Sequence, residues 1–146
     1  MHIDIVIATY NRADLLPGCV QSILDAPAPA GLSRSILIVD NNSSDQTAQV
    51  GRRLEAESPG QVRYLFEPRP GKSHALNTGI ANATGELVGM VDDDEEVDRG
   101  WLHAIGRAFQ NAEVSFIGGP YYGKWICERP RWLPPRKLPR AGHSVS

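Results

Sequence analysis

The chain has 146 residues, 41% of them hydrophobic and 22% charged, with a formal net charge of −2. This length predicts a single domain built around one hydrophobic core. No run of about 18 apolar residues occurs, and no basic and apolar leader opens the chain, so we expect neither a membrane span nor a signal peptide. Cys19 and Cys127 are two isolated thiols, and without a secretory signal we expect them to be reduced core or surface cysteines, not a disulfide framework or a metal site.

Short apolar segments alternate with helical patterns along the first 120 residues. In chain order we predict strand 3–8, helix 15–24, strand 35–39, helix 46–57, strand 62–66, helix 73–83, strand 86–91, helix 98–110 and strand 114–117. The first strand is almost wholly apolar, which is typical of a strand covered on both faces. The alternation predicts an α/β fold, namely a Rossmann-like, mostly parallel sheet with helices on both faces.

Polar residues follow four of the predicted strands. In open parallel sheets, ligands bind outside the carboxyl ends of the strands, so residues at these positions should face one crevice. The four clusters are residues 9–12, 40–45, 69–72 and 92–94.

The densest of these clusters is acidic. Six carboxylates lie between Asp92 and Asp98, and Asp92, Asp93 and Asp94 directly follow the apolar run 87–91, which we expect to be a buried strand. Neighbouring carboxylates in a folded cleft raise one another's pKa unless a cation lies between them. Mg2+ or Mn2+, held by one or two carboxylates and the phosphates of a ligand, would be such a cation. The alternative is an acidic turn that caps the next helix.

The loop after the first strand contains three candidate nucleotide ligands. Thr9, Tyr10 and Arg12 offer hydroxyl groups, a ring that can stack and a cation, a set suited to a base and a phosphate. The alternative is that Tyr10 is a rim residue and Arg12 a solvated charge near the start of a helix.

Asp40 and Lys72 complete the candidate set. Asp40 could accept a hydrogen bond from a nucleobase N–H or a ribose hydroxyl, or it could instead close the turn with Asn42 and Ser44. Lys72 lies where a helix begins, so its ammonium and the helix amides could face an anion. The segment is not a P-loop, because the upstream glycine is missing. A metal-bridged nucleotide diphosphate fits all four clusters.

Other nucleotide-binding or acidic α/β classes fit less well. A receiver domain needs an acidic pair after the first strand, where this chain has Ala8-Thr9-Tyr10. Dinucleotide-binding domains need a glycine-rich first turn. A nucleotidyltransferase is a weaker alternative, because the glycine signature that this class usually carries after the first strand is missing from this chain as well.

Four ordered segments together resemble the inverting family 2 glycosyltransferases of GT-A fold. They are residues 6–12, 38–45, 71–79 and 91–94. The resemblance implies a nucleotide-diphosphate sugar as donor, with a UDP-sugar as first choice, and Mn2+ or Mg2+ as cofactor. It places Thr9, Asp40 and Lys72 at the nucleotide and Asp92 and Asp94 at the Asp-X-Asp metal position, with Asp93 facing the ribose or sugar.

The same resemblance implies that part of an enzyme is missing. Family members continue well beyond this length, and their later half contains the acceptor site and a catalytic carboxylate. After the predicted fifth strand the only acid is Glu128, so no convincing base is found for an inverting transfer. We expect a donor-binding half that is truncated after the fifth strand, with an unassigned acceptor; the alternative is a non-catalytic nucleotide- and metal-binding module.

Residues 121–146 form a separate basic segment after the domain of residues 1–120. Lys124–Ser146 holds six Lys or Arg and one Glu, whereas residues 1–123 hold nine basic and sixteen acidic residues. Four prolines exclude regular helix from the segment, so we expect a loop across the acidic face. A basic tail with tryptophans also allows peripheral association with a membrane, but we expect no nucleic-acid partner. We expect a cytoplasmic location, which includes association with the inner face of the membrane. We also expect self-association through exposed aromatic residues near Tyr121 and Tyr122.

Overall fold

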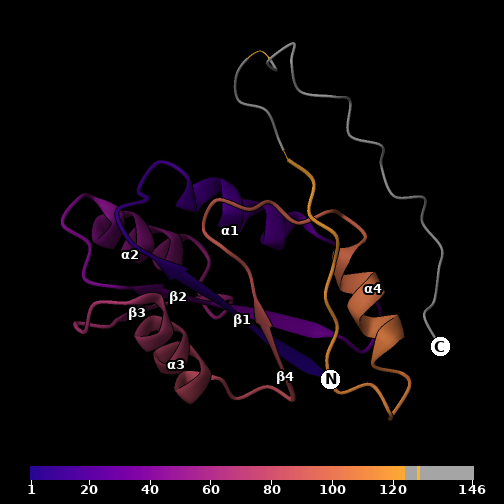
Figure 1. Cartoon of the computed structure of the whole chain (residues 1–146). Helices are drawn as coiled ribbons and strands as arrows, with labels where there is room; N and C mark the ends of the chain where they lie inside the picture. Colours follow the sequence, from indigo (N-terminus) through magenta and orange to yellow (C-terminus); the bar gives the residue numbers. More distant parts are fainter. Residues whose placement is uncertain (124–127, 129–146) are drawn as a thin grey trace.

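A computed structural model of the chain describes residues 1–123 and 128 (Figure 1). Its elements alternate as predicted, and most bounds lie within two residues of the prediction. They are β1 (His2–Thr9), α1 (Leu16–Asp25), β2 (Ser33–Asp40), α2 (Thr47–Glu57), β3 (Val62–Phe66), α3 (Lys72–Asn82), β4 (Leu87–Met90) and α4 (Trp101–Ala108). Over the described residues, no helix combines the length and the apolar character that crossing a bilayer requires.

The strands form one parallel sheet with the order β3-β2-β1-β4. Thr9 at the end of β1 pairs with Asp40 at the end of β2, and Asp40 pairs with Phe66 at the end of β3. The carboxyl ends of these three strands are therefore level. β4 joins the other side of β1, with Met90 opposite Val6. This register confirms the α/β sheet and brings the loops that follow the strands to one edge.

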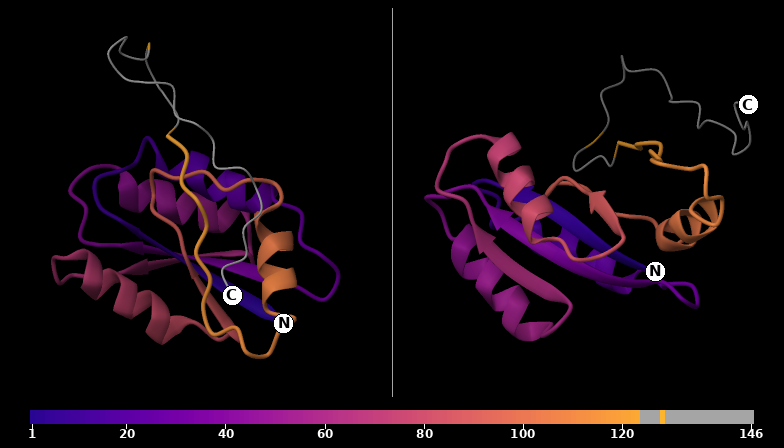
Figure 2. Two further views of the ribbon diagram at one scale, coloured as in Figure 1. Left: turned by 45° about the vertical axis from the view of Figure 1, so that its right-hand side comes forward. Right: turned by 90° about the horizontal axis from the view of Figure 1, so that it is seen from below.

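Helices cover both faces of the sheet, as Figures 1 and 2 show. Side chains alternate between the faces along a strand, so Ile5 and Ile7 point to one side of β1 and Val6 to the other. On the first side they pack with buried residues of α1, α2 and α4, including Leu16, Val20, Ile23, Leu54, Leu102 and Ile105. On the second side Val6 packs with Leu37 and Val39 of β2 and with Ala75 of α3.

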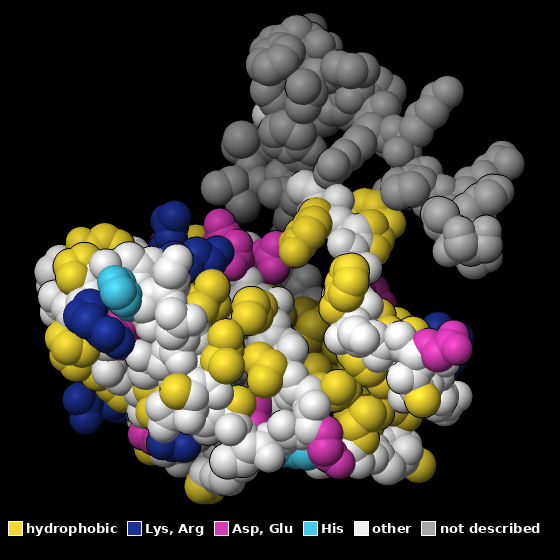
Figure 3. Space-filling model, turned by 60° about the horizontal axis from the view of Figure 1, so that its bottom comes forward, with side chains coloured by type: hydrophobic (Ala, Val, Ile, Leu, Met, Phe, Trp, Pro, Cys, Tyr) yellow, Lys and Arg dark blue, Asp and Glu magenta, His cyan; other side chains and the backbone are white. Residues whose placement is uncertain are grey.

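β4 differs from its prediction as a buried strand. Val88 and Met90 are 42% and 55% exposed, and they alternate with partly buried neighbours. β4 is an edge strand, and within residues 1–123 and 128 no helix covers its second face. A continuous apolar run therefore does not prove burial on both sides. Hydrophobic side chains gather beside a hollow on the face of the molecule that Figure 3 presents.

The predicted fifth strand, residues 114–117, is wrong for this structure. These residues are described, but they form no strand, and Phe116 is 88% exposed. Apolar composition makes a segment able to form a strand, whereas the strand itself needs a partner with free backbone groups in register. The expectation for the basic tail lies outside the described residues, apart from 121–123 and 128.

Candidate functional site

A cavity of about 610 Å³ lies at the carboxyl ends of the strands, and all four predicted clusters contribute to it. This volume is in the range of small-molecule sites. The predicted crevice is thus confirmed as a cavity. Its lining residues are Ala8, Thr9, Tyr10, Arg12, Asn41, Asn42, Pro70, Gly71, Lys72, Asp92, Asp93 and Asp94.

Thr9 is a buried polar residue at the wall of this cavity. It ends β1 and is only 2% exposed. Its hydroxyl Oγ1 is buried and has no hydrogen-bond partner among the described residues. A buried hydroxyl without a partner costs about 1–3 kcal/mol. The hydroxyl is therefore an unsatisfied polar group at the wall of the cavity.

The rest of the loop after β1 is fixed to the loop after β2. Asn11 has the unusual φ of 52°, and its side-chain oxygen accepts the backbone N–H of Ser44 at 2.8 Å. The backbone N–H of Arg12 donates to the buried Thr47 hydroxyl at 2.9 Å. Tyr10, which is 58% exposed, and Arg12 both line the cavity. The sequence predicted Tyr10 and Arg12 here but gave no sign of the role of Asn11.

Asp40 lies behind the cavity wall and does not line it. It is fully buried, and its Oδ1 accepts the N–H of Ser43 at 2.9 Å while its Oδ2 accepts the Tyr64 hydroxyl at 2.7 Å. Burial and the bond to this carboxylate raise the pKa of Tyr64 well above its usual range. The next residues, Asn41 and Asn42, face the cavity. The bond to Ser43 shows that Asp40 does help to close the turn after β2. The role of Asp40 as a nucleotide ligand stays a prediction.

Lys72 and Asp92 connect two of the clusters across the cavity. Lys72 is the first residue of α3, and its Nζ lies 2.5 Å from Oδ1 of Asp92. This bond outweighs partial burial and raises the pKa of Lys72 above its usual value. Both side chains are more than half exposed, at 57% and 51%. The pair can therefore open to admit a ligand that offers the ammonium a different anion.

The acidic loop after β4 suits a hard cation. Asp93 is half-buried and Asp94 exposed at the cavity. Burial, together with the charges of Asp93 and Glu95, raises the pKa of the neighbouring Cys19 thiol to about 12. No group of three His, Cys, Asp or Glu residues in the described part of the chain converges on one point. The loop fits a cation bound by one or two carboxylates and completed by ligand oxygens.

The helix-cap alternative for the aspartate triplet finds less support. α4 begins only at Trp101, and its first turn contains no acidic residue. The acid that bonds the backbone next to the start of α4 is Asp98, whose Oδ1 accepts the N–H of Gly100 at 2.7 Å.

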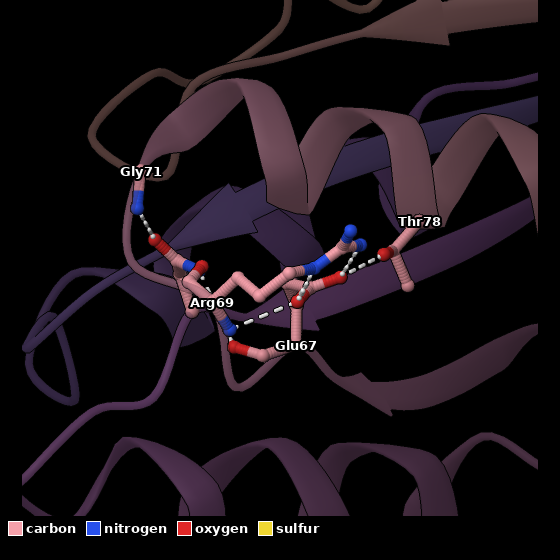
Figure 4. Close-up of polar contacts among 5 residues, drawn as sticks. Glu67, Arg69, Gly71 and Thr78 are labelled. Atoms are coloured by element: carbon pink, nitrogen blue, oxygen red, sulfur yellow. Dashed lines mark hydrogen bonds and ion pairs between the residues drawn. The ribbon is translucent and has the colours of Figure 1, made fainter.

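The structure also shows a polar network in the loop between β3 and α3 that the sequence did not indicate. Glu67 is 3% exposed and pairs with Arg69, while the Thr78 hydroxyl of α3 donates to the same carboxylate (Figure 4). The side chain of Asn41 accepts the N–H of Gly71 and donates to the carbonyl of Arg69, both at 2.7 Å. In the sequence, Glu67 and Arg69 are visible only as two opposite charges separated by one proline, and this spacing does not indicate that Glu67 is buried.

Comparisons with known proteins identify a family for this chain. A family model described as glycosyl transferase family 2 matches residues 4–143. An uncharacterized glycosyltransferase, alr2836, from Nostoc sp. (strain PCC 7120) is 32% identical over 114 residues. That alignment covers 78% of this chain and 34% of the relative, so the chain spans about a third of that protein.

Two solved structures share the fold. S. aureus TarS 1-349 has a TM-score of 0.68 at 20% identity, over 83% of this chain and 39% of that one. The mannosyltransferase PcManGT from Pyrobaculum calidifontis, solved with GDP-Man and Mn2+, has a TM-score of 0.64 at 29% identity, over 80% and 33%. The matched family model covers nearly the whole chain, which therefore belongs to glycosyl transferase family 2 and has the GT-A type of sheet.

Proposed function

We propose that this chain is the donor-binding half of a metal-dependent glycosyltransferase, and that it holds a nucleotide-diphosphate sugar with Mn2+ or Mg2+. The observation that carries the proposal is the single cavity in which a buried unpaired hydroxyl, a lysine and an acidic loop meet. It is supported by the relatives, since PcManGT was solved with GDP-Man and Mn2+, and TarS with UDP and with UDP-GlcNAc. A UDP-sugar is our first choice of donor.

Each part of the cavity has a distinct task in this proposal. The base lies against Thr9 and Tyr10, with Asp40 behind them. The diphosphate replaces Asp92 as the partner of Lys72, because two phosphates carry more charge than one carboxylate. Arg12 lies beside the phosphates as a second cation.

The aspartate loop holds the cation in this proposal. Asp92, once released from Lys72, and Asp94 are the metal ligands, and Asp93 faces the ribose or sugar. A divalent metal bound there neutralises charge on the departing diphosphate. Two carboxylates and phosphate oxygens are the ligands that such a cation takes beside a phosphorylated substrate.

We assign transfer itself to a protein of the relatives' length, because this chain spans only about a third of the length of alr2836. Transfer with inversion needs a base that takes the proton of the acceptor hydroxyl. Beyond the acidic loop and α4, Glu113 and Glu128 are the only acids in the sequence, and both are exposed. A module that binds nucleotide and metal without turnover is the second candidate.

The partners and location expected from the sequence stay proposals. Self-association is supported by exposed apolar side chains, since Phe116 is 88% and Tyr121 73% exposed. A cytoplasmic location and association with the inner face of a membrane rest on composition alone, and the acceptor stays unassigned.

Calorimetric titration of UDP into the 146-residue chain tests the proposed function. We expect binding in Mn2+ or Mg2+ that weakens roughly tenfold or more in EDTA, because the aspartate loop and the diphosphate repel without a cation. Asp94→Asn should weaken the metal-dependent binding far more than Glu96→Gln, a control in the same acidic segment. Equal affinity in EDTA, or equal effects of the two variants, would contradict the metal role.

A further inference from the structure

Glu67 is a buried carboxylate that the proposed function leaves unused. It is 3% exposed and lies in the loop between β3 and α3, outside the cavity lining. A buried charge is retained only when it is paired and hydrogen-bonded. Glu67 meets this condition, because Arg69 donates to it through Nε and Nη2 at 2.8 Å each and through its backbone N–H at 2.9 Å. These bonds and that from Thr78 hold the pKa of Glu67 well below its usual range.

These contacts tie the loop to two elements at once. The Thr78 hydroxyl anchors Glu67 to the second turn of α3 (Figure 4). On the other side, Asn41, the residue directly after β2, bonds the loop backbone at Arg69 and Gly71. Two prolines, Pro68 and Pro70, fix further backbone torsions of the same loop. The loop therefore has little freedom to move independently of the sheet.

The consequence is the placement of two basic side chains. The guanidinium of Arg69 is held by Glu67, and Arg69 is not among the residues that line the cavity. Lys72, three residues later, does line it and reaches Asp92 at 2.5 Å. The loop thus directs one cation into the cavity and keeps the other outside it.

We propose that Glu67 is a positioning residue for donor binding: it sequesters Arg69 and fixes the start of α3, so that Lys72 is the cation this loop presents to the donor's diphosphate. The inference rests on the proposed function. It predicts an effect on the phosphates and not on the base. Thr9 ends β1 and Tyr10 follows it, and the next residues of that loop have their own bonds to residues 43–47.

The test compares the affinities for UDP and UMP in Mn2+, measured by calorimetry. Glu67→Gln keeps the size of the side chain but loses its charge and one of the two acceptors for Arg69. We expect UDP binding to weaken roughly tenfold and UMP binding to change less than about twofold. The matched control is Glu57→Gln, which removes an exposed pair with Arg53 at 3.7 Å on α2 and should change neither affinity.

A second pair of variants keeps the test sharp if Glu67→Gln folds poorly. Thr78→Val removes the hydroxyl that reaches Glu67 and should weaken UDP binding, whereas Thr78→Ser retains a hydroxyl and should restore it. UDP binding that is unchanged or tighter in Glu67→Gln, or UDP and UMP weakened equally, would overturn the positioning role. The positioning role would also be overturned if the wild-type chain bound UMP and UDP with the same affinity. A wild-type chain that binds neither nucleotide would overturn the proposed function itself.

Discussion

Asp4 offers a stability test that depends on the charge of one buried residue. It lies in β1, is 2% exposed, and accepts the backbone N–H groups of Thr84 at 2.6 Å and Gly85 at 2.7 Å. The hydroxyl of Ser35 donates to its other oxygen. Because residues 84 and 85 lead into β4, these bonds join that strand to the sheet and so help to place the aspartate loop.

Two substitutions separate the loss of the acceptors from the loss of the charge. Asp4→Ala leaves two backbone N–H groups without their acceptor, so we expect the free energy of unfolding to fall by about 3 kcal/mol. Asp4→Asn can still offer one oxygen to both N–H groups, and its NH2 can donate to Ser35 or to the nearby His2 ring. It should therefore cost only about 1 kcal/mol, for the weaker neutral bonds. Urea denaturation at pH 7 measures both.

The pH dependence gives the sign of the effect. Burial tends to raise the pKa of Asp4, but the hydrogen bonds from Ser35, Gly85 and Thr84 outweigh it, so the folded pKa lies below the ordinary 3.8. A lowered folded pKa means that the charge adds stability above pH 3.8, and that this stability is lost as the pH falls through the folded pKa. The advantage of wild type over Asp4→Asn should shrink in acid. An advantage that grows in acid, or equal losses for Asp4→Asn and Asp4→Ala, would refute this reasoning.

Two further predictions concern packing and turnover. A Cβ at Gly79 of α3 would lie 2.3 Å from Cγ1 of the buried Val6, so Gly79→Ala should destabilise the chain by about 1–3 kcal/mol in thermal or urea denaturation. Gly119→Ala is the control, since no atom of the described residues lies within 4 Å of its added Cβ; equal losses would contradict the packing argument. The purified chain should transfer sugar to no acceptor, although slow donor hydrolysis is compatible with the site. Robust transfer in a product assay would show that a base is present, and Glu128 would be the first residue to replace.

The parts of the fold that follow from local pattern were predictable. β1 and β2 are apolar runs bounded by polar loops, and their alternation with helices identifies a parallel sheet. Because parallel strands end at one edge, the meeting of Thr9, Lys72 and Asp92 around one cavity also followed from the order of the elements.

The failures concern contacts between residues far apart in sequence. Residues 114–117 have the composition of a strand, but no local signal states whether a partner edge exists. The inward direction of Asp40 is decided by Tyr64, a residue of another strand. The burial of Glu67 depends in the same way on Thr78 in the following helix. Sequence spacing indicates which loops meet, and the side-chain partners depend on register and packing.

A crystal structure of this chain with UDP and Mn2+ tests the central claim most directly. The account predicts the base against Thr9 and Tyr10, the diphosphate at Lys72 in place of Asp92, and the metal between the diphosphate and Asp94. A nucleotide bound outside this cavity, or a metal that contacts none of Asp92, Asp93 and Asp94, would contradict it.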